Sequence, residues 1–375
     1  MNIALLTSNL SRITKDATRG PDIFVHSLLR QLTNQVGKNN LSVTAFASGD
    51  SELPVETLSI DKLSLFENKN IPKANRKLFE LALISKSLSL SDQFDLYHIN
   101  IGNGELILPF ASLVNKPILV TLHSAFEEGD QHYFELFKDL KNVFFVPISN
   151  GQKSRMPFLN FTQTIYHGID ETQFSVGDKP KQNDSILWAG RGDPDKGMDI
   201  AIEVIQKAKR SGRIFFVEKE KYRDWTDAIL AKKYNNISIN NGLDRQDLVS
   251  EYQNAKLFLS PLRWEEPFGL VMIESLSCGT PLVAFAKGSV PEIIIDGETG
   301  FIVNASEEDK RGDWIIKKTG IEGLCEAVEK IYAMSPSEYE KMRSNCRKHV
   351  EENFTAERMA SDYEKIYESL VNSTI

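Results

Sequence analysis

The chain has 375 residues, and its 44 lysines and arginines against 52 aspartates and glutamates give a formal net charge of −8. Hydrophobic residues make up 41% and charged residues 26% of the sequence, which is typical of a globular protein and excludes fibrous and disordered classes. The acidic balance argues against a nucleic-acid partner, because phosphate contacts need a basic face. The length predicts two domains.

Cysteine usage and the first residues of the chain indicate a cytoplasmic protein. The three cysteines, Cys278, Cys325 and Cys346, are too few and too widely spaced for a disulfide scaffold or a zinc site. The opening residues Met1–Thr7 lack the basic, apolar and cleavage regions of a signal peptide, so we expect none. No stretch approaches the roughly 18 uncharged apolar residues of a membrane-spanning helix.

The first part of the chain alternates short apolar runs with amphipathic segments. Ile23–Leu32 and Lys73–Leu90 place apolar residues mostly on one face and are predicted helices. The apolar runs have strand length and predict a parallel sheet that is covered on both faces. These runs are Asn2–Ser8, Leu41–Ser48, Asp95–Asn100, Pro117–His123 and Val143–Ser149.

The same alternation restarts after a linker-like segment, Asp170–Asp184. The predicted strands of this second series are Ser185–Gly190, Arg213–Val217, Ile237–Asn240, Lys256–Leu262 and Pro281–Ala286. Its predicted helices are Met198–Lys209, Tyr222–Tyr234, Arg245–Ala255 and Leu270–Cys278. We therefore predict an α/β protein with domains at residues 1–168 and 169–354, and a helix within 355–375 that packs back on the first domain.

Three histidines of the first domain, His98, His123 and His167, lie at or just past the ends of predicted strands. Open parallel sheets bind ligands at the carboxyl ends of their strands, so a functional role is one hypothesis for these imidazoles. A structural role for each of them is the other.

The stretch Ser260–Glu274 is the most informative part of the sequence. A predicted strand ends in a loop with Pro267 and Gly269, and a helix begins near Gly269. A helix start presents unpaired N–H groups and a partial positive charge, which together bind phosphate. Glu274 lies on the face of this helix start and is suited to accept hydrogen bonds from a ribose diol, while Glu266 in the loop faces a sugar. The alternative is that both are ordinary acids of a first helical turn.

A second informative segment is the turn Ala189–Gly197. Arg191 ends a predicted strand and Lys196 follows five residues later, so two cations are placed to bind a diphosphate and to neutralise a departing nucleotide. A solvated turn is the alternative. The tripeptide Asp193-Pro194-Asp195 has the D-x-D form of metal-dependent sugar transferases, but its cationic neighbours favour structural turn acids, and we predict no metal site.

Taken in this order, the segments resemble the GT-B glycosyltransferases of family 4. The resemblance rests on the Glu266-x7-Glu274 spacing and the Gly190–Gly197 turn, covers nearly the whole chain, and is strongest from Ser185 to Val303. Further matching segments are Phe94–His98, Val120–His123, Ile165–Asp170, Gly279–Ala284, Val290–Ile294 and Asp296–Phe301.

The resemblance implies a GT-B fold, in which two Rossmann-like domains face a central cleft, and a retaining transfer from a nucleotide-diphosphate sugar without metal or cofactor. UDP-glucose or another UDP-hexose is the expected donor because such donors are frequent in the family. The residues that the resemblance assigns to catalysis are His123, near the anomeric carbon, Glu266, Arg191 and Lys196. Those assigned to the donor are Arg191 and Lys196 for the diphosphate, Leu243 for the nucleobase, Glu274 for the ribose, and Glu266 with the backbone of Phe268, Gly269 and Leu270 for the sugar. Gly190 and Val271 are further predicted donor-binding residues.

The chain departs from the family pattern in a few places. Arg19-Gly20-Pro21-Asp22 holds one glycine where many members have two, so Arg19 and Gly20 are predicted donor or acceptor contacts, with Arg19 available to an anionic group. His167 stands where an asparagine is usual. The segment Ser306–Thr319 resembles a charged insertion, to which we assign no function.

A basic cluster in Lys69–Leu90 permits two interpretations. One is an interfacial helix that docks on anionic lipid at the inner face of a membrane. The other, which we prefer, is an amphipathic helix that covers the sheet. The basic residues are Lys69, Lys73, Arg76, Lys77 and Lys86.

We therefore predict a cytoplasmic, retaining, metal-independent glycosyltransferase that moves a hexose from a UDP-glucose-type donor. The acceptor is left open among glycans, lipid-linked molecules and small molecules. The alternatives are a GT-B nucleotide-sugar epimerase or phosphorylase, and a catalytically inert GT-B partner subunit.

Overall fold

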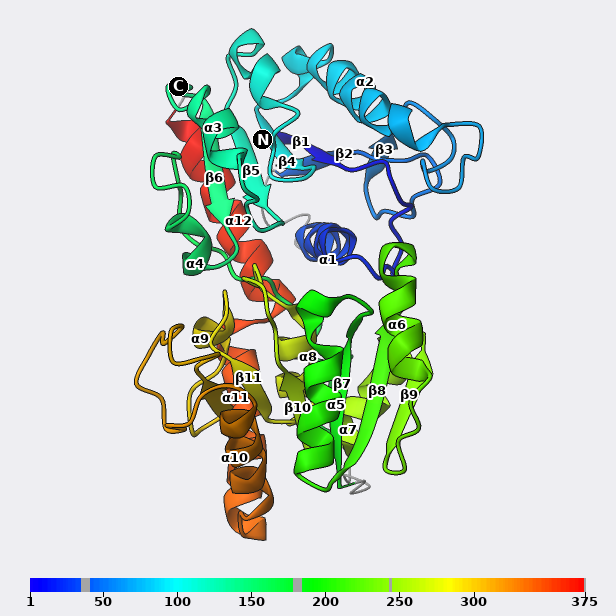
Figure 1. Cartoon of the computed structure of the whole chain (residues 1–375). Helices are drawn as coiled ribbons and strands as arrows, with labels where there is room; N and C mark the ends of the chain where they lie inside the picture. Colours follow the sequence, from blue (N-terminus) through cyan, green and yellow to red (C-terminus); the bar gives the residue numbers. More distant parts are fainter. Residues whose placement is uncertain (35–40, 178–183, 243–244, 374–375) are drawn as a thin grey trace. The chain divides into compact units, whose positions relative to one another are not determined.

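The computed structural model describes residues 1–34, 41–177, 184–242 and 245–373 (Figure 1). The chain divides into two compact units. Unit 1 comprises Met1–Gly168 and Ala356–Ile375, and unit 2 comprises Ile169–Thr355. The last helix of the chain is therefore part of the unit that begins with the first residue.

Each unit is built on a six-stranded parallel sheet. The order is β3-β2-β1-β4-β5-β6 in unit 1 and β9-β8-β7-β10-β11-β12 in unit 2, which is the strand order of the Rossmann fold in both cases. The predicted α/β class with two Rossmann-like sheets is confirmed. The strands of unit 1 are β1 (Asn2–Thr7), β2 (Ser42–Phe46), β3 (Glu56–Leu58), β4 (Leu96–Asn100), β5 (Ile118–Leu122) and β6 (Val143–Pro147). Those of unit 2 are β7 (Ser185–Arg191), β8 (Ser211–Val217), β9 (Ile237–Asn241), β10 (Leu257–Ser260), β11 (Leu282–Phe285) and β12 (Gly300–Val303).

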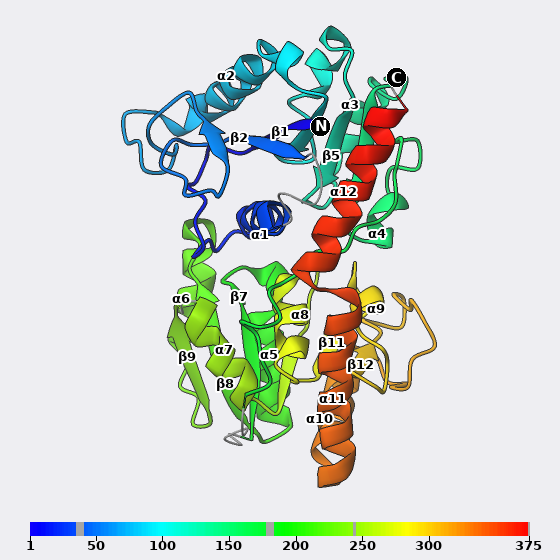
Figure 2. The ribbon, with the colours of Figure 1, turned by 180° about the vertical axis from the view of Figure 1, so that it is seen from behind.

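The sheet of unit 1 is buried on both faces, because successive side chains of a strand point in opposite directions. Ile3 and Leu5 of β1 pack with α1 (Gly20–Asn34) and α12 (Ala356–Asn372), whereas Ala4 and Leu6 pack with α2 (Arg76–Leu88). Figure 2 shows α12, in red, beside α1. Leu83 and Ile84 of α2 are buried in the same core as Leu6. Shorter elements complete the unit: η1 (Lys73–Asn75), η2 (Ser91–Gln93), η3 (Leu108–Leu113), α3 (Asp130–Glu135) and α4 (Asn150–Lys153).

Helices also pack around the sheet of unit 2. α5 (Met198–Lys207) contacts α10 (Gly320–Tyr332), and α8 (Leu270–Ser277) contacts both α7 (Arg245–Asn254) and α11 (Pro336–Asn353). A capping box fixes the start of α11, where the Ser335 hydroxyl accepts from the Glu338 N–H and the Glu338 carboxylate accepts from the Ser335 N–H. The remaining elements are η4 (Pro194–Lys196), η5 (Glu220–Tyr222), α6 (Arg223–Leu230) and α9 (Val290–Ile293).

Some element boundaries differ from the sequence-based expectation. The strand expected to reach Leu262 ends at Ser260, because Pro261 has no N–H for the ladder. The helix expected at Tyr222–Tyr234 is the shorter α6. β3 was not predicted because it has only three residues. Across the residues that the structure describes, no helix is both long and apolar enough to cross a membrane.

Candidate functional site

The start of α8 lies at the end of a loop that follows β10. Gly269 is the residue before the helix and has a φ of +86°, a left-handed conformation that favours glycine. A Cβ at Gly269 would come within 2.5 Å of the Met272 methyl carbon. Phe268 precedes this glycine and is buried, while Leu270 and Val271 form the first turn, whose N–H groups are those that a helix leaves without an intrahelical acceptor.

A charged cluster surrounds Trp264 in the loop before α8. The Lys196 ammonium forms an ion pair with the Glu266 carboxylate, and the Trp264 Nε1–H donates to the same carboxylate oxygen at 3.1 Å. The Lys196 Nζ lies 4.5 Å and the Arg191 Cζ 5.6 Å from the Trp264 ring. The Lys196 and Glu266 side chains are only 16% and 11% exposed. The structure thus brings three predicted site residues together on a tryptophan to which the sequence analysis gave no role.

The turn between Arg191 and Lys196 is organised by Asp193. The Arg191 Nε donates to one Asp193 carboxylate oxygen at 3.0 Å, and the other oxygen accepts the Lys196 backbone N–H at 3.2 Å. Asp193 is buried and caps η4, as expected of a structural turn acid. Gly190, the residue before Arg191, lies against the Trp188 ring. Within the described ranges, no group of three or more His, Cys, Asp or Glu residues is arranged to hold a metal ion.

Glu274 lies in the second turn of α8 and is buried, with 2% exposure. Its Oε1 accepts hydrogen bonds from the Arg245 Nε at 2.9 Å and Nη2 at 2.6 Å, and its Oε2 accepts from the Tyr252 hydroxyl at 3.2 Å. The carboxylate that was predicted to meet a ribose is therefore paired with α7. Arg245 and Tyr252 were missed as site residues, although their seven-residue spacing places them on one face of α7. Leu243, predicted at the nucleobase, lies outside the described residues.

His123 follows β5 directly at the carboxyl edge of the first sheet. Its Nε2 lies 2.9 Å from the Asn100 Oδ1, which assigns the ring proton to Nε2, and its ring stacks on His167 at 5.7 Å. Burial, with a contribution from Arg19, lowers the pKa of His123 to about 3. The imidazole is therefore neutral at neutral pH, and its buried Nδ1 has no hydrogen-bond partner among the described residues.

His98 was expected at a strand end, and this expectation is wrong. It lies in the middle of β4, fully buried, with its Nδ1 2.7 Å from the Tyr367 hydroxyl and its Nε2 2.8 Å from the Thr121 hydroxyl. The strand continues for two residues beyond it, and both ring nitrogens are satisfied inside unit 1. We conclude that His98 is a structural residue.

Arg19 and Gly20 lie where α1 begins. The Arg19 Nη1 donates to the Ser11 hydroxyl at 2.6 Å, and this hydroxyl donates to the Asp22 carboxylate at 2.6 Å. Burial raises the pKa of Asp22 above its ordinary value, against the lowering effect of Arg19. The Arg19 side chain stays 38% exposed, and a Cβ at Gly20 would meet no atom within 4 Å. This corner of unit 1 is therefore ordered, and it has open space at Gly20.

Residues 169–349 match the family described as Glycosyl transferases group 1. This stretch is nearly all of unit 2, so the chain carries a group 1 glycosyltransferase domain. Together with the two Rossmann-like sheets, this match places unit 2 among the group 1 glycosyltransferase domains and gives the chain the two-sheet architecture of the GT-B fold. The predicted family resemblance is confirmed for this domain.

The chain is also similar to individual proteins and solved structures. Over 189 residues the chain is 28% identical to an uncharacterized 41.2 kDa protein in the cps region of Klebsiella pneumoniae, an alignment that covers 50% of this chain and 47% of that protein. The chain thus spans about half the length of this curated relative. Its fold is similar to that of the sucrose-phosphate synthase tll1590 from Thermosynechococcus elongatus, with a TM-score of 0.76, 20% identity and 99% of each chain covered. It is also similar to Anabaena Alr3699/HepE in complex with UDP-glucose, with a TM-score of 0.72, 15% identity, and 99% of this chain and 100% of that chain covered.

Proposed function

We propose that the chain is a retaining, metal-independent glycosyltransferase that moves a hexose from a UDP-glucose-type donor to a hydroxyl group of an acceptor. The observation that carries the proposal is the cluster of Arg191, Lys196 and Glu266 around Trp264, in the loop that leads into α8. Support for the donor comes from the similar structure of HepE, which is a complex with UDP-glucose.

The charges of this cluster suit a diphosphate that leaves a sugar. Lys196 and Arg191 supply positive charge, and the first N–H groups of α8 supply further hydrogen-bond donors to phosphate oxygens. Fixed cations stabilise the negative charge that develops on a departing nucleotide, so they lower the barrier to breaking the sugar–phosphate bond. Arg191 and Lys196 therefore act as electrostatic catalysts in this proposal.

Glu266 and Glu274 bind the other two parts of the donor in this proposal, the sugar and the ribose. The Glu266 carboxylate pairs with Lys196. When a diphosphate binds to Lys196 it competes for this ammonium group, so the Glu266 carboxylate becomes available to accept hydrogen bonds from the hydroxyl groups of the sugar. Glu274 accepts three hydrogen bonds from Arg245 and Tyr252, and a carboxylate has about four lone-pair sites, so one site on Oε2 remains for a ribose hydroxyl. For His123, the proposal is a neutral hydrogen-bonding contact to the donor sugar.

The test is a screen of nucleotide-sugar hydrolysis and transfer by the full chain, with EDTA in a parallel series. We expect UDP-glucose or a related UDP-hexose to be turned over, the anomeric configuration to be retained, and EDTA to leave the rate unchanged. Loss of activity in EDTA that manganese restores would contradict metal independence. Tight binding of a nucleotide sugar without turnover would favour the inert-subunit alternative, and release of an epimerised nucleotide sugar would favour an epimerase.

A further inference from the structure

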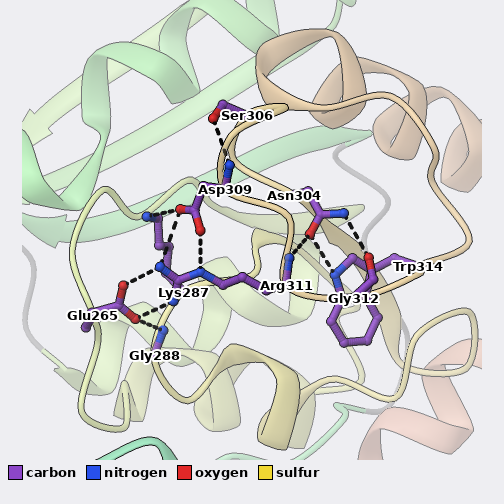
Figure 3. Close-up of polar contacts among 9 residues, drawn as sticks. All are labelled: Glu265, Lys287, Gly288, Asn304, Ser306, Asp309, Arg311, Gly312 and Trp314. Carbon is purple, nitrogen blue, oxygen red and sulfur yellow. Dashed lines mark hydrogen bonds and ion pairs between the residues drawn. The ribbon is translucent and has the colours of Figure 1, made fainter. Parts of the chain in front are cut away.

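The charged loop Ser306–Thr319 connects β12 to α10 and is organised around one asparagine (Figure 3). The Asn304 Oδ1 accepts the Arg311 backbone N–H at 2.8 Å and the Trp314 Nε1–H at 3.2 Å, and its Nδ2 donates to the Gly312 carbonyl at 2.9 Å. Asn304 directly follows β12, so the loop is tied to the end of the sheet. This segment, to which the sequence analysis gave no function, has a defined conformation.

Arg311 projects from this loop onto the segment that precedes α8. Its Nη1 and Nη2 donate to the two carboxylate oxygens of Glu265 at 2.7 and 2.6 Å, and its Nε donates to Asp309 at 2.7 Å. Asp309 in turn pairs with Lys287. A two-pronged arginine–carboxylate contact fixes orientation as well as distance, which a single point charge does not. The charged loop therefore holds Glu265 in one geometry.

Glu265 precedes Glu266 in the chain, and both residues accept hydrogen bonds from the backbone of the segment 287–289. The Gly288 N–H donates to Glu265 at 2.7 Å, and the Ser289 N–H donates to the Glu266 carbonyl at 3.0 Å. Gly288 has a φ of +53°, and a Cβ there would lie 2.2 Å from the Glu266 carbonyl oxygen. The Glu266 backbone is thus held on this side, while its carboxylate reaches Lys196 and Trp264.

The Arg311–Glu265 contact is suited to this role by its charge state. Burial raises the pKa of Glu265, but hydrogen bonds from Arg311 and from the Gly288 N–H outweigh it and leave that pKa below its ordinary value. The hydrogen bonds that Arg311 donates to Glu265 and Asp309 raise the pKa of its guanidinium. Both partners are therefore charged at neutral pH, with side chains that are 33% and 28% exposed.

We infer that Arg311 is a positioning residue, which acts through Glu265 to hold Glu266 in the orientation that binds the donor sugar. The inference rests on the proposed function and deepens it, because it assigns the charged loop to the sugar part of the donor. The nucleotide part is held separately in the proposal, by Glu274 with Arg245 and Tyr252, none of which has a described contact with the charged loop. Loss of Arg311 should therefore affect the sugar more than the nucleotide.

The same loop offers a matched control. Lys317 pairs with Asp313 at 2.6 Å, and the two side chains are 68% and 94% exposed. Removing Lys317 deletes a cation from the charged loop, as removing Arg311 does, but breaks no contact to Glu265. Exposed pairs of this kind contribute little to stability, so Lys317→Ala should behave like the parent protein.

The experiment compares Arg311→Ala, Arg311→Lys and Lys317→Ala in the full chain. In the absence of any ligand, hydrogen–deuterium exchange of the peptide that spans residues 264–270 should become at least about 5-fold faster in Arg311→Ala, be intermediate in Arg311→Lys, and be unchanged in Lys317→Ala. The kcat/KM for UDP-glucose should fall roughly 10- to 100-fold in Arg311→Ala, the scale of a small misplacement of a binding group. The Kd for UDP alone should change less than about 2-fold.

The outcomes separate the two hypotheses. If the parent protein turns over no nucleotide sugar, the proposed function is refuted. The hydrogen–deuterium exchange measurement would still decide whether Arg311 holds the segment that contains Glu266. Exchange that is the same in Arg311→Ala and Lys317→Ala would overturn the inference. An equal loss of UDP and UDP-glucose binding in Arg311→Ala would overturn it too, because it would indicate general damage to unit 2.

Discussion

Lys196 is the residue whose removal tests the proposed electrostatic role most directly. Its ammonium pairs with Glu266 and lies over the Trp264 ring, largely shielded from water. We expect Lys196→Ala to lower kcat for the donor by at least ~10²-fold, the scale of losing one preorganised charge contact. Lys207→Ala is the control, because Lys207 pairs with Glu203 on the surface of α5. Steady-state kinetics equal to those of the parent would contradict the assignment of Lys196 to the diphosphate.

Glu274 should contribute to nucleotide affinity. We expect Glu274→Ala to raise the Kd for UDP by roughly 10- to 100-fold, because hydrogen bonds to a charged group are each worth about 1.5–3 kcal/mol. Isothermal titration calorimetry measures this change. Tyr252→Phe is the control, since it removes one hydrogen bond to the same carboxylate and leaves the carboxylate itself in place. An unchanged affinity in Glu274→Ala would remove the ribose assignment.

His98 should make the stability of unit 1 depend on pH. Burial, with a smaller effect of His123, lowers the pKa of His98 from 6.5 to about 3, so the folded protein keeps this ring neutral where the unfolded chain protonates it. The stabilisation is therefore complete above about pH 6.5 and is lost as the pH falls toward 3, by about 1.4 kcal/mol per pH unit for one such histidine. In His98→Gln the slope of the free energy of unfolding against pH should be smaller by the contribution of one proton, about 1.4 kcal/mol per pH unit. Urea unfolding at pH 7, 6 and 5 measures this slope, and identical slopes in both proteins would exclude the effect.

At the scale of elements, the sequence allowed most strands and helices to be predicted because their apolar patterns are local. The position of α8 followed from Pro267 and Gly269, and the grouping of Arg191, Lys196 and Glu266 agrees with the motifs. The pairing of Glu274 with Arg245 could not be predicted from the sequence, because it depends on which face of α7 packs against α8. The contact of Arg311 with Glu265 could not be predicted either, because Glu265 lies 46 residues earlier in the sequence. His98 was misplaced although the strand itself was predicted correctly, since both the predicted strand Asp95–Asn100 and β4 end at Asn100, two residues beyond this histidine.

The loop at Gly288 provides a prediction at this scale. Gly288→Ala should destabilise unit 2 by about 1–3 kcal/mol, because alanine is strained at this φ and its Cβ would collide with the Glu266 carbonyl. Thermal unfolding measures the change. For comparison, Gly20→Ala adds a methyl group where no atom lies within 4 Å and should leave the stability of unit 1 nearly unchanged. If Gly288→Ala and the parent protein are equally stable, the backbone of residues 287–289 can move to accommodate the methyl group, and it does not fix Glu266.

At the scale of the whole molecule, α12 contributes side chains to the core of unit 1, although it lies far from the rest of that unit in the sequence. Tyr363 and Tyr367 are fully buried there, and their hydroxyls reach Thr121 and His98. We expect a chain truncated after Thr355 to lose amide protection in β1 and β4 while β7 and β10 stay protected, as measured by hydrogen exchange. Truncation after Asn372 keeps the helix and serves as the control. Full protection of β1 without α12 would show that unit 1 is complete without its last helix.

The split of unit 1 between the two ends of the chain has a consequence for biosynthesis. A ribosome releases the residues of unit 2 before those of α12, so unit 2 has its full sequence available while the first sheet still lacks one of its covering helices. The face of β1 that carries Ile3 and Leu5 then remains only partly covered until α12 has been translated. The half of the protein that is made first is the half that finishes folding last, and during that interval its apolar surface is a target for molecular chaperones.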